Sequence, residues 1–188
     1  MQIAYLISAH TDAPQLKRLI DALHSKAEFF IHIDSKADIE NFTRLIKGSN
    51  IHFIHQRVDV VWGTMVEVEY QMNLLRAAVA FPSHFDRIFF LSGMDYPLWS
   101  NARITQWLES LGDKEILQGF CMDQPGLSAA QHEMYPVARP FSRHRKWAIA
   151  QRILRKALGL RKRLSFCVDS DEWHLYKGSA WWCITEAL

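Results

Sequence analysis

Polar side chains follow several apolar segments of this sequence, at the point where each segment ends. The segments are residues 2–8, 29–34, 51–54 and 87–92, and each is typical of a buried strand. The residues at or just after their ends are His10, Asp34, Lys36, Trp62, Gly63, Ser92, Gly93 and Asp95. Open α/β sheets bind ligands at the carboxyl ends of their strands, so we expect these side chains to border one site. A carboxylate such as Asp34 can accept hydrogen bonds from a ribose or a base edge, which favours a nucleotide ligand.

The sequence lacks the two common phosphate loops. Its first turn, residues 8–14, reads SAHTDAP and contains no glycine, so it provides no GxGxxG cradle for a pyrophosphate. The GxxxxGK[ST] pattern of P-loop proteins does not occur either. A nicotinamide dehydrogenase and a P-loop NTPase are therefore not expected.

Local structure could also account for some of these polar residues. Asp34 could cap the helix that follows it, and Asp95 could be a turn residue. His32, Asp34 and His52 resemble part of a metal site, which leaves a metal-dependent hydrolase as a further hypothesis. Histidines in strands are more often packed and hydrogen-bonded than bound to metal.

Helical patterns separate the apolar segments. The predicted helices start after Thr11 or Asp12, cover residues 38–47 and 65–80, and follow a predicted N-cap at Asn101. This alternation of strands and helices predicts an α/β sheet with helices on both faces. Farther along, the pattern predicts strands at residues 116–120 and 181–185, a loop at residues 124–140 and a helix at residues 147–158.

The net charge of the sequence conceals an uneven distribution. The formal charge is only +2, yet one segment carries ten of the 22 basic residues and no acidic residue. These ten are Arg139, Arg143, Arg145, Lys146, Arg152, Arg155, Lys156, Arg161, Lys162 and Arg163. Interleaved apolar residues predict a basic amphipathic helix over residues 143–163, which either packs on the sheet or binds an anionic membrane surface. No nucleic-acid partner is expected, because the rest of the chain is acidic and no nucleic-acid motif occurs.

Length, composition and cysteines limit the class of protein. With 188 residues, 49% of them hydrophobic, the chain has the size of one domain with a buried core. Cys121, Cys167 and Cys183 form no CxxC pair, so we expect reduced, buried thiols. No apolar run is long enough to span a membrane, and no signal peptide precedes the first strand. These features predict a cytoplasmic protein, which could lie peripherally on the inner membrane face through its basic segment.

Four motifs occur in order along the chain. They are HIDSK at residues 32–36, VWG at residues 61–63, FLSGMDYPL at residues 90–98 and KGSAWW at residues 177–182. In this order and at these separations they resemble the core-2/I-branching β-1,6-N-acetylglucosaminyltransferase family, glycosyltransferase family 14, which also includes peptide O-xylosyltransferases. The resemblance extends from residue 2 to about residue 185 and is weakest over residues 121–175. Because the sequence starts at its first strand, without the Golgi anchor and stem of animal members, we expect a bacterial protein.

The resemblance implies a GT-A-like, Rossmann-like fold that binds a UDP-sugar. It implies transfer of GlcNAc or xylose, with inversion, to a surface glycan or glycolipid acceptor, without a metal ion or other cofactor. The residues that it places around the donor are His10, Asp34, Lys36, Trp62, Gly63, Ser92, Gly93 and Asp95. The residues that it places beside the sugar and the acceptor are Tyr96, Gly178, Ser179, Trp181 and Trp182.

The resemblance also implies a catalytic base that this sequence does not contain. In the family, the base is a glutamate in a Pro-x-Glu segment that would lie beyond Leu188. We therefore expect one glycosyltransferase domain, residues 1–188, that is incomplete at its C-terminus, or one in which Asp171, Glu172 or Glu186 replaces the base. The alternative is a non-catalytic domain that binds a membrane or a protein partner through its basic helix.

Overall fold

The computed structural model describes residues 1–23, 26–61, 64–121, 134–136, 153–154, 157–158, 161–163 and 176–188. The chain divides into two compact units. One unit comprises residues 1–118 and 179–188, and the other comprises residues 119–178. The first unit holds most of the central sheet and its covering helices.

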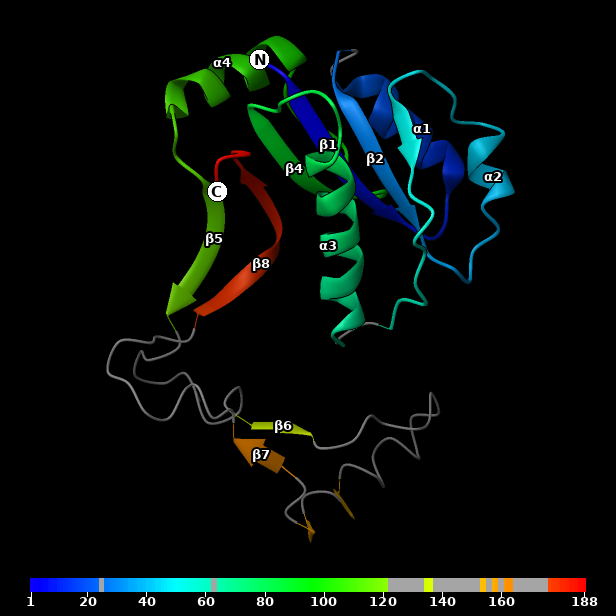
Figure 1. The fold of residues 1–188 in the computed structure, drawn as a ribbon, viewed down its shortest axis with the longest axis vertical. Helices are drawn as coiled ribbons and strands as arrows, with labels where there is room; N and C mark the ends of the chain where they lie inside the picture. Colours follow the sequence, from blue (N-terminus) through cyan, green and yellow to red (C-terminus); the bar gives the residue numbers. More distant parts are fainter. Residues whose placement is uncertain are drawn as a thin grey trace. The chain divides into compact units, whose positions relative to one another are not determined.

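The central sheet has six strands and is mostly parallel. The strand order is β3 (Ile51–Phe53), β2 (Glu28–Ile33), β1 (Ile3–Ala9), β4 (Arg87–Ser92), β8 (Tyr176–Ile184) and β5 (Ile116–Cys121) (Figure 1). Strand β1 pairs in parallel with β2 and β4, and β2 pairs in parallel with β3. Strand β8 runs antiparallel to β4. The predicted α/β sheet is confirmed, and β8 adds an antiparallel strand beside its parallel part.

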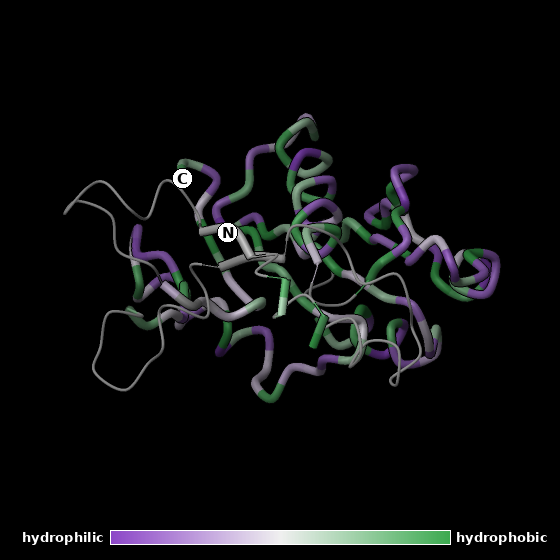
Figure 2. Tube along the Cα trace, turned by 90° about the horizontal axis from the view of Figure 1, so that it is seen from below, coloured by the Kyte–Doolittle hydropathy of each residue, from purple (hydrophilic) through white to green (hydrophobic). Residues whose placement is uncertain are grey.

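Helices cover both faces of this sheet, as the sequence predicts. Helices α1 (Ala13–Ala22), α2 (Glu40–Thr43) and α4 (Asn101–Leu111) contribute to one buried cluster, and α3 (Val66–Val79) contributes to the other. Alternation along β1 serves both clusters, because Tyr5 and Ile7 face α1 whereas Ala4 and Leu6 face α3. In Figure 2, hydrophobic and hydrophilic residues alternate along the helical coils, as expected of amphipathic helices.

The parallel register aligns the carboxyl ends of the inner strands. Ser8 of β1 lies opposite His32 of β2 on one side and Ser92 of β4 on the other. The chain continues from β1 to β2 and returns later to place β4 on the opposite side of β1. A crevice is expected where strand connections diverge in this way.

The ends of two predicted helices differ from the sequence pattern. The predicted helix over residues 38–47 contains only the four-residue α2, followed by single turns. Ser100, and not Asn101, caps α4, since its Oγ accepts a hydrogen bond from Arg103 N at 3.4 Å. The Asn101 side chain instead donates to Ala22 O at 3.1 Å, so it ties α4 to the end of α1. Of the two predicted starts of α1, Asp12 is the cap, because its Oδ1 accepts a hydrogen bond from Gln15 N at 3.0 Å.

The second unit contains a short hairpin-like pair of strands. Strands β6 (Met134–Pro136) and β7 (Arg161–Arg163) pair antiparallel. The predicted loop over residues 124–140 is therefore wrong at β6, and the predicted basic helix over residues 143–163 is wrong at its end. At residues 161–163 the backbone pairs with β6 although the apolar spacing of the segment is helical. Gly159, a poor helix former, separates the helical pattern from these three basic residues. The hydrogen bond from Leu158 N to Leu154 O at 2.9 Å confirms a helical turn within the pattern.

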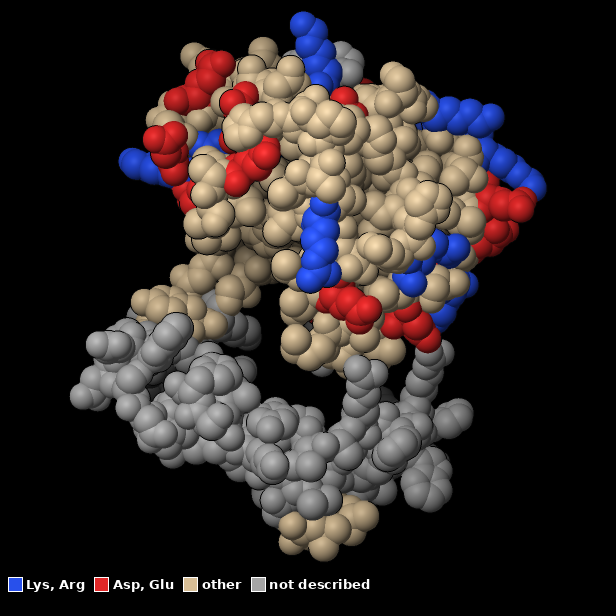
Figure 3. All heavy atoms as spheres, viewed as in Figure 1, with Lys and Arg blue, Asp and Glu red and all other residues tan. Residues whose placement is uncertain are grey.

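Most of the basic segment lies outside the described residues. On the face seen in Figure 3, the described Lys and Arg side chains stand beside Asp and Glu side chains and form no continuous basic patch. None of the helices in the described part of the chain combines the length and hydrophobicity needed to cross a bilayer.

Candidate functional site

A polar cavity of about 270 Å³ lies at the carboxyl ends of β1, β2 and β4. It is lined by Ser8, Ala9, His10, Asp34, Val60, Glu67, Tyr70, Phe90, Ser92, Ala180 and Trp181. Three predicted donor residues, His10, Asp34 and Ser92, therefore border one space although they are far apart in the sequence. This arrangement follows from the parallel register, since each of the three lies at or just after a strand end.

Asp34 is held in place by neighbouring charges and amides. Its side chain is 7% exposed, and Oδ1 accepts a hydrogen bond from Lys36 N at 2.9 Å. The Lys36 ammonium lies 3.3 Å from Oδ2 of Asp34 and also contacts Asp59, whose hydrogen bond is the main cause of the raised pKa of Lys36. The ammonium donates further to Val60 O at 2.5 Å. Lys36 is not among the residues that line the cavity, so its contribution is to fix Asp34 and the chain near Val60.

Arg57 fixes the turn that carries Asp34. Its guanidinium donates to Ile33 O at 2.9 Å, to Asp34 O at 2.8 Å and to Ala37 O at 2.5 Å. The sequence pattern gives no indication of this role, because Arg57 lies between the third strand and the VWG motif and belongs to neither. A guanidinium satisfies several carbonyl groups at once, which explains how one residue can hold a turn of this kind.

His32 is buried beneath the site. Its ring is 0% exposed, stacks on Tyr70 with centroids 5.1 Å apart, and accepts a hydrogen bond at Nε2 from Val58 N at 3.1 Å. Burial lowers the pKa of His32 from 6.5 to about 4, so the ring is neutral at pH 7. Its Nδ1 has no hydrogen-bond partner within the part of the chain that the structure describes.

The metal-site hypothesis is not supported by this arrangement. His52 Nε2 lies 2.6 Å from Glu28 Oε2, whereas His32 engages the backbone of Val58. Among the described residues, no three His, Cys, Asp or Glu side chains are grouped so that they could hold a metal ion. In the HxD motif, His32 is therefore a packed residue of β2 and Asp34 is a carboxylate at the end of the strand.

The turn after β4 connects the strand to α1 and β8. Asp95 Oδ2 accepts hydrogen bonds from Ser92 N and from Trp181 Nε1, both at 2.8 Å, and Asp95 O accepts from Gln15 Nε2 at 3.1 Å. Gly93 N donates to Ser8 O at 2.8 Å, which brings the turn against the end of β1. Asp95, which the sequence predicts beside the donor, lines the neighbouring apolar cavity, and its carboxylate contacts Trp181, which borders both cavities.

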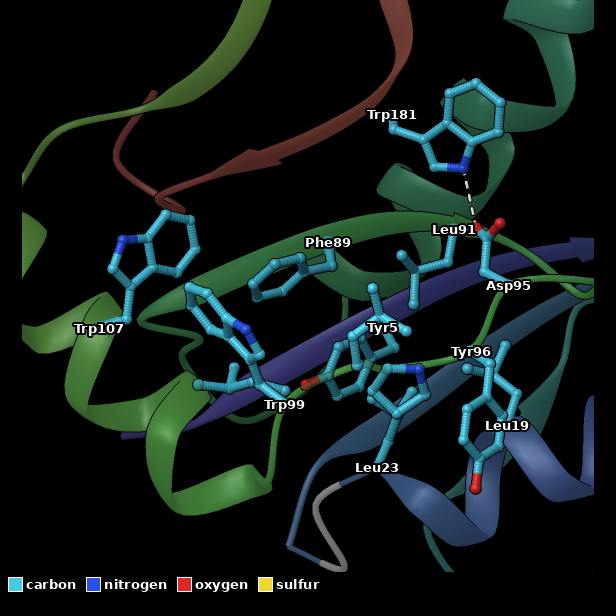
Figure 4. A pocket seen from close by; sticks show the side chains of 13 residues that line it. Tyr5, Leu19, Leu23, Phe89, Leu91, Asp95, Tyr96, Trp99, Trp107 and Trp181 are labelled. Atoms are coloured by element: carbon cyan, nitrogen blue, oxygen red, sulfur yellow. Dashed lines mark hydrogen bonds between the residues drawn. The ribbon is translucent and has the colours of Figure 1, made fainter.

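An apolar cavity of about 550 Å³ adjoins this turn (Figure 4). It is lined by Tyr5, Leu19, Leu23, Phe89, Leu91, Asp95, Tyr96, Pro97, Leu98, Trp99, Ile104, Trp107 and Trp181. Figure 4 shows the aromatic rings of Trp99, Trp107 and Phe89 grouped at one end and the Trp181–Asp95 hydrogen bond at the other. Tyr96 and Trp181, both predicted beside the acceptor, thus border the same space.

The two adjacent tryptophans of β8 have different surroundings. Trp181 is 53% exposed and borders both cavities, whereas Trp182 stacks on Phe90 with centroids 5.7 Å apart. Trp182 Nε1 also donates to Gln71 Oε1 of α3 at 3.0 Å. Trp182 therefore packs mainly on the α3 side of the core, and of the two only Trp181 lines the polar and the apolar cavity described above.

The remaining predicted residues differ in their relation to the site. Ser179 Oγ accepts a hydrogen bond from Trp181 N at 3.2 Å, and Gly178 is an exposed residue of β8. Glu186 is not a base for this site, since its carboxylate accepts a hydrogen bond from Phe85 N, before the start of β4. The antiparallel direction of β8 carries Glu186 to the end of the sheet opposite Ser92. The predictions for Trp62, Gly63, Asp171 and Glu172 fall outside the described residues.

Two cysteines lie within the described residues. Cys183 is a buried thiol, and burial raises its pKa to about 12, whereas Cys121 is half-buried. The expectation of a buried, reduced thiol is confirmed for Cys183. Cys167 lies outside the part of the chain that the structure describes.

Comparison with known proteins gives the site a family context. The family model for the core-2/I-branching enzyme matches residues 3–188. A human β-1,3-galactosyl-O-glycosyl-glycoprotein β-1,6-N-acetylglucosaminyltransferase is 27% identical over 122 residues, which are 62% of this chain and 28% of that protein. Bovine xylosyltransferase 2 is 26% identical over 145 residues, which are 71% of this chain and 17% of that protein.

The match extends over nearly the whole chain but only part of each relative. The chain spans less than a third of the length of these curated relatives. Its six-stranded mixed sheet with helices on both faces is consistent with a GT-A-like glycosyltransferase fold. The chain belongs to the core-2/I-branching enzyme family.

Proposed function

We propose that this protein is a glycosyltransferase that takes a sugar from a UDP-sugar and transfers it to a hydroxyl of a glycan or glycolipid acceptor. The family supports sugar transfer, and the relatives whose names specify the sugar transfer N-acetylglucosamine or xylose. In the reaction, the acceptor oxygen bonds to the anomeric carbon, the bond from that carbon to the UDP oxygen breaks, and the acceptor proton passes to a base.

The observation that carries this proposal is the polar cavity at the strand ends. Asp34 is nearly buried, and Arg57 and Lys36 hold the turn around it. A carboxylate fixed in this way is suited to accept hydrogen bonds from the hydroxyls of a ribose. His10, Ser8 and Ser92 supply further polar groups around the same space.

We propose further that donor binding needs no divalent metal ion. The segment from Ser92 to Asp95 offers one carboxylate, and that carboxylate accepts hydrogen bonds from the Ser92 backbone and the Trp181 indole. Among the described residues, it is not grouped with other His, Cys, Asp or Glu side chains in a way that could hold a metal ion. Positive charge near the donor is then expected from basic side chains.

Calorimetric titration with UDP in the presence of EDTA tests both parts of the proposal. We expect saturable binding in EDTA, and we expect Asp34→Asn to weaken it about 10- to 100-fold, since hydrogen bonds to a charged group contribute about 1.5–3 kcal/mol. Asp21→Asn, an exposed acid on α1, is the matched control and should leave the UDP affinity unchanged.

Three results would contradict the proposal. Folded protein that binds no UDP would refute the assignment of the donor site. Binding that requires manganese would refute its metal-independent part. Equal losses in Asp34→Asn and Asp21→Asn would show that the cavity at the strand ends is not the donor site.

A further inference from the structure

The lining of the apolar cavity contains few polar groups. Among the described residues that line it, Asp95 is the only charged one, and its Oδ2 already accepts two hydrogen bonds. Most of the others are aliphatic or aromatic, and the phenol of Tyr5 is almost completely buried. A sugar placed here would find only a few hydrogen-bond partners for its hydroxyls, such as Asp95 Oδ1 and the Tyr96 phenol, so burying it fully would be costly. A hydrocarbon group has no such requirement.

The size and the rim of the cavity also favour a hydrocarbon ligand. Its volume of about 550 Å³ falls within the range of about 300–1,000 Å³ that is typical of small-molecule sites. Leu98 at the rim is 96% exposed, and Tyr96 and Trp99 are 56% and 40% exposed. Adjacent large apolar side chains with this much exposure mark binding surfaces more often than isolated ones do.

The apolar cavity is joined to the polar cavity through one side chain. Trp181 lines both of them, and its indole is fixed by the hydrogen bond to Asp95 (Figure 4). A molecule that fills the apolar cavity with its hydrocarbon part can therefore place a polar head beside Trp181. That position borders the cavity in which the donor sugar is proposed to bind.

We propose that the apolar cavity binds the aliphatic aglycone of the acceptor, so that the acceptor is a sugar attached to a hydrocarbon chain. This inference rests on the proposed glycosyltransferase function and names the acceptor class for the same site. Trp181 separates the two parts of the acceptor: the chain lies against Leu98 and Trp99, and the sugar lies toward Ser92. The hydrocarbon supplies affinity, and the fixed indole orients the sugar.

Titration with hexyl, heptyl, octyl and nonyl β-D-glucosides below their micelle concentrations tests this assignment. Each added methylene that enters the cavity should lower Kd about fourfold, which is the fold-change equivalent to about 0.8 kcal/mol per buried methylene. Leu98→Asp should weaken nonyl glucoside at least tenfold and flatten the dependence on chain length. Met65→Asp replaces another exposed apolar residue, at the start of α3, and should leave the series unchanged.

UDP titration of the same variants separates this inference from the proposed function. Leu98→Asp should bind UDP as the unaltered protein does, so a loss of UDP binding in all variants would refute the donor site and not the lipid cavity. A Kd independent of chain length, or equal chain-length dependence in Leu98→Asp, would overturn the aglycone assignment. Octanol binding as tightly as octyl glucoside would overturn the acceptor role. A dimer that Leu98→Asp dissociates would assign the apolar surface to a second copy of the chain.

Discussion

The close approach of Gly93 to Ala9 leads to a quantitative prediction about the site. A Cβ atom added at Gly93 would lie 2.7 Å from Ala9 Cβ, 3.4 Å from Ala9 Cα and 3.5 Å from Ser8 O. The first of these distances is a severe overlap, whereas the others are ordinary contacts. Gly112 is the glycine with positive φ among the described residues, so the difficulty at Gly93 is steric and not conformational.

The magnitude of the effect follows from these distances. Gly93→Ala should destabilise the fold by about 1–3 kcal/mol, the usual cost of overpacking a buried position. Ala9→Gly should cost about 1–2 kcal/mol, because it removes a buried methyl group and adds chain entropy to the unfolded state. In the double variant, the overlapping atom is gone. We therefore expect the double variant to be about as stable as Ala9→Gly alone, with a coupling of at least about 1 kcal/mol.

Urea unfolding followed by circular dichroism measures the free energy of unfolding of the unaltered protein, the two single variants and the double variant. UDP titration adds a second measurement, since Gly93→Ala moves the turn that ends β4 and should weaken UDP binding, whereas the double variant should recover most of it. If the changes in the free energy of unfolding caused by the two single substitutions add up to that of the double variant within about 0.5 kcal/mol, Gly93 and Ala9 are not in contact as described. The reasoning on the β1–β4 junction would then be refuted.

Three further predictions concern other parts of the first unit. Arg57→Met should lower the free energy of unfolding, measured in urea, by about 1–3 kcal/mol and weaken UDP binding, because three carbonyl groups each lose a hydrogen bond from the guanidinium. Unchanged UDP affinity would contradict the positioning role of Arg57. The pKa of His32 is lowered from 6.5 to about 4, so the unfolded chain binds a proton more readily and stability should fall by about 3 kcal/mol as the pH drops from 6.5 to 4. His32→Gln should lack this part of the pH dependence, and an identical slope would disprove the assignment. In a chain with Cys121→Ser and Cys167→Ser, the thiol of Cys183 should react with a disulfide reagent only at the rate of unfolding, because burial raises its pKa to about 12; rapid labelling of folded protein would contradict this.

The sequence pattern leaves several side-chain positions and partners undetermined for a common physical reason. Glu186 follows the KGSAWW motif closely, but β8 runs antiparallel to β4 and carries Glu186 away from the site. The motifs that contain Lys36 and Asp95 likewise do not indicate their partners, Asp59 and Trp181, which are distant in sequence. Strand direction and side-chain partners depend on contacts between distant segments, so local spacing does not specify them.

The amino-acid sequence by itself determined the alternation of strands and helices and the position of polar residues at strand ends. The motif resemblance also placed Trp181 and Trp182 together beside the acceptor, and it did not distinguish between them. The spacing of apolar residues is enough to predict strands and helices, because each element buries one face and its own sequence shows which face that is.

Only the tertiary structure decided which residues share a cavity. It selected Trp181 over Trp182, added Arg57 and Tyr70, and placed an apolar cavity beside a polar one on the two sides of Trp181. These features arise where β1, β4 and β8 meet, and they are fixed by the register of pairs such as Ile3 with Arg87 and Ile88 with Ile184, which are distant in the chain.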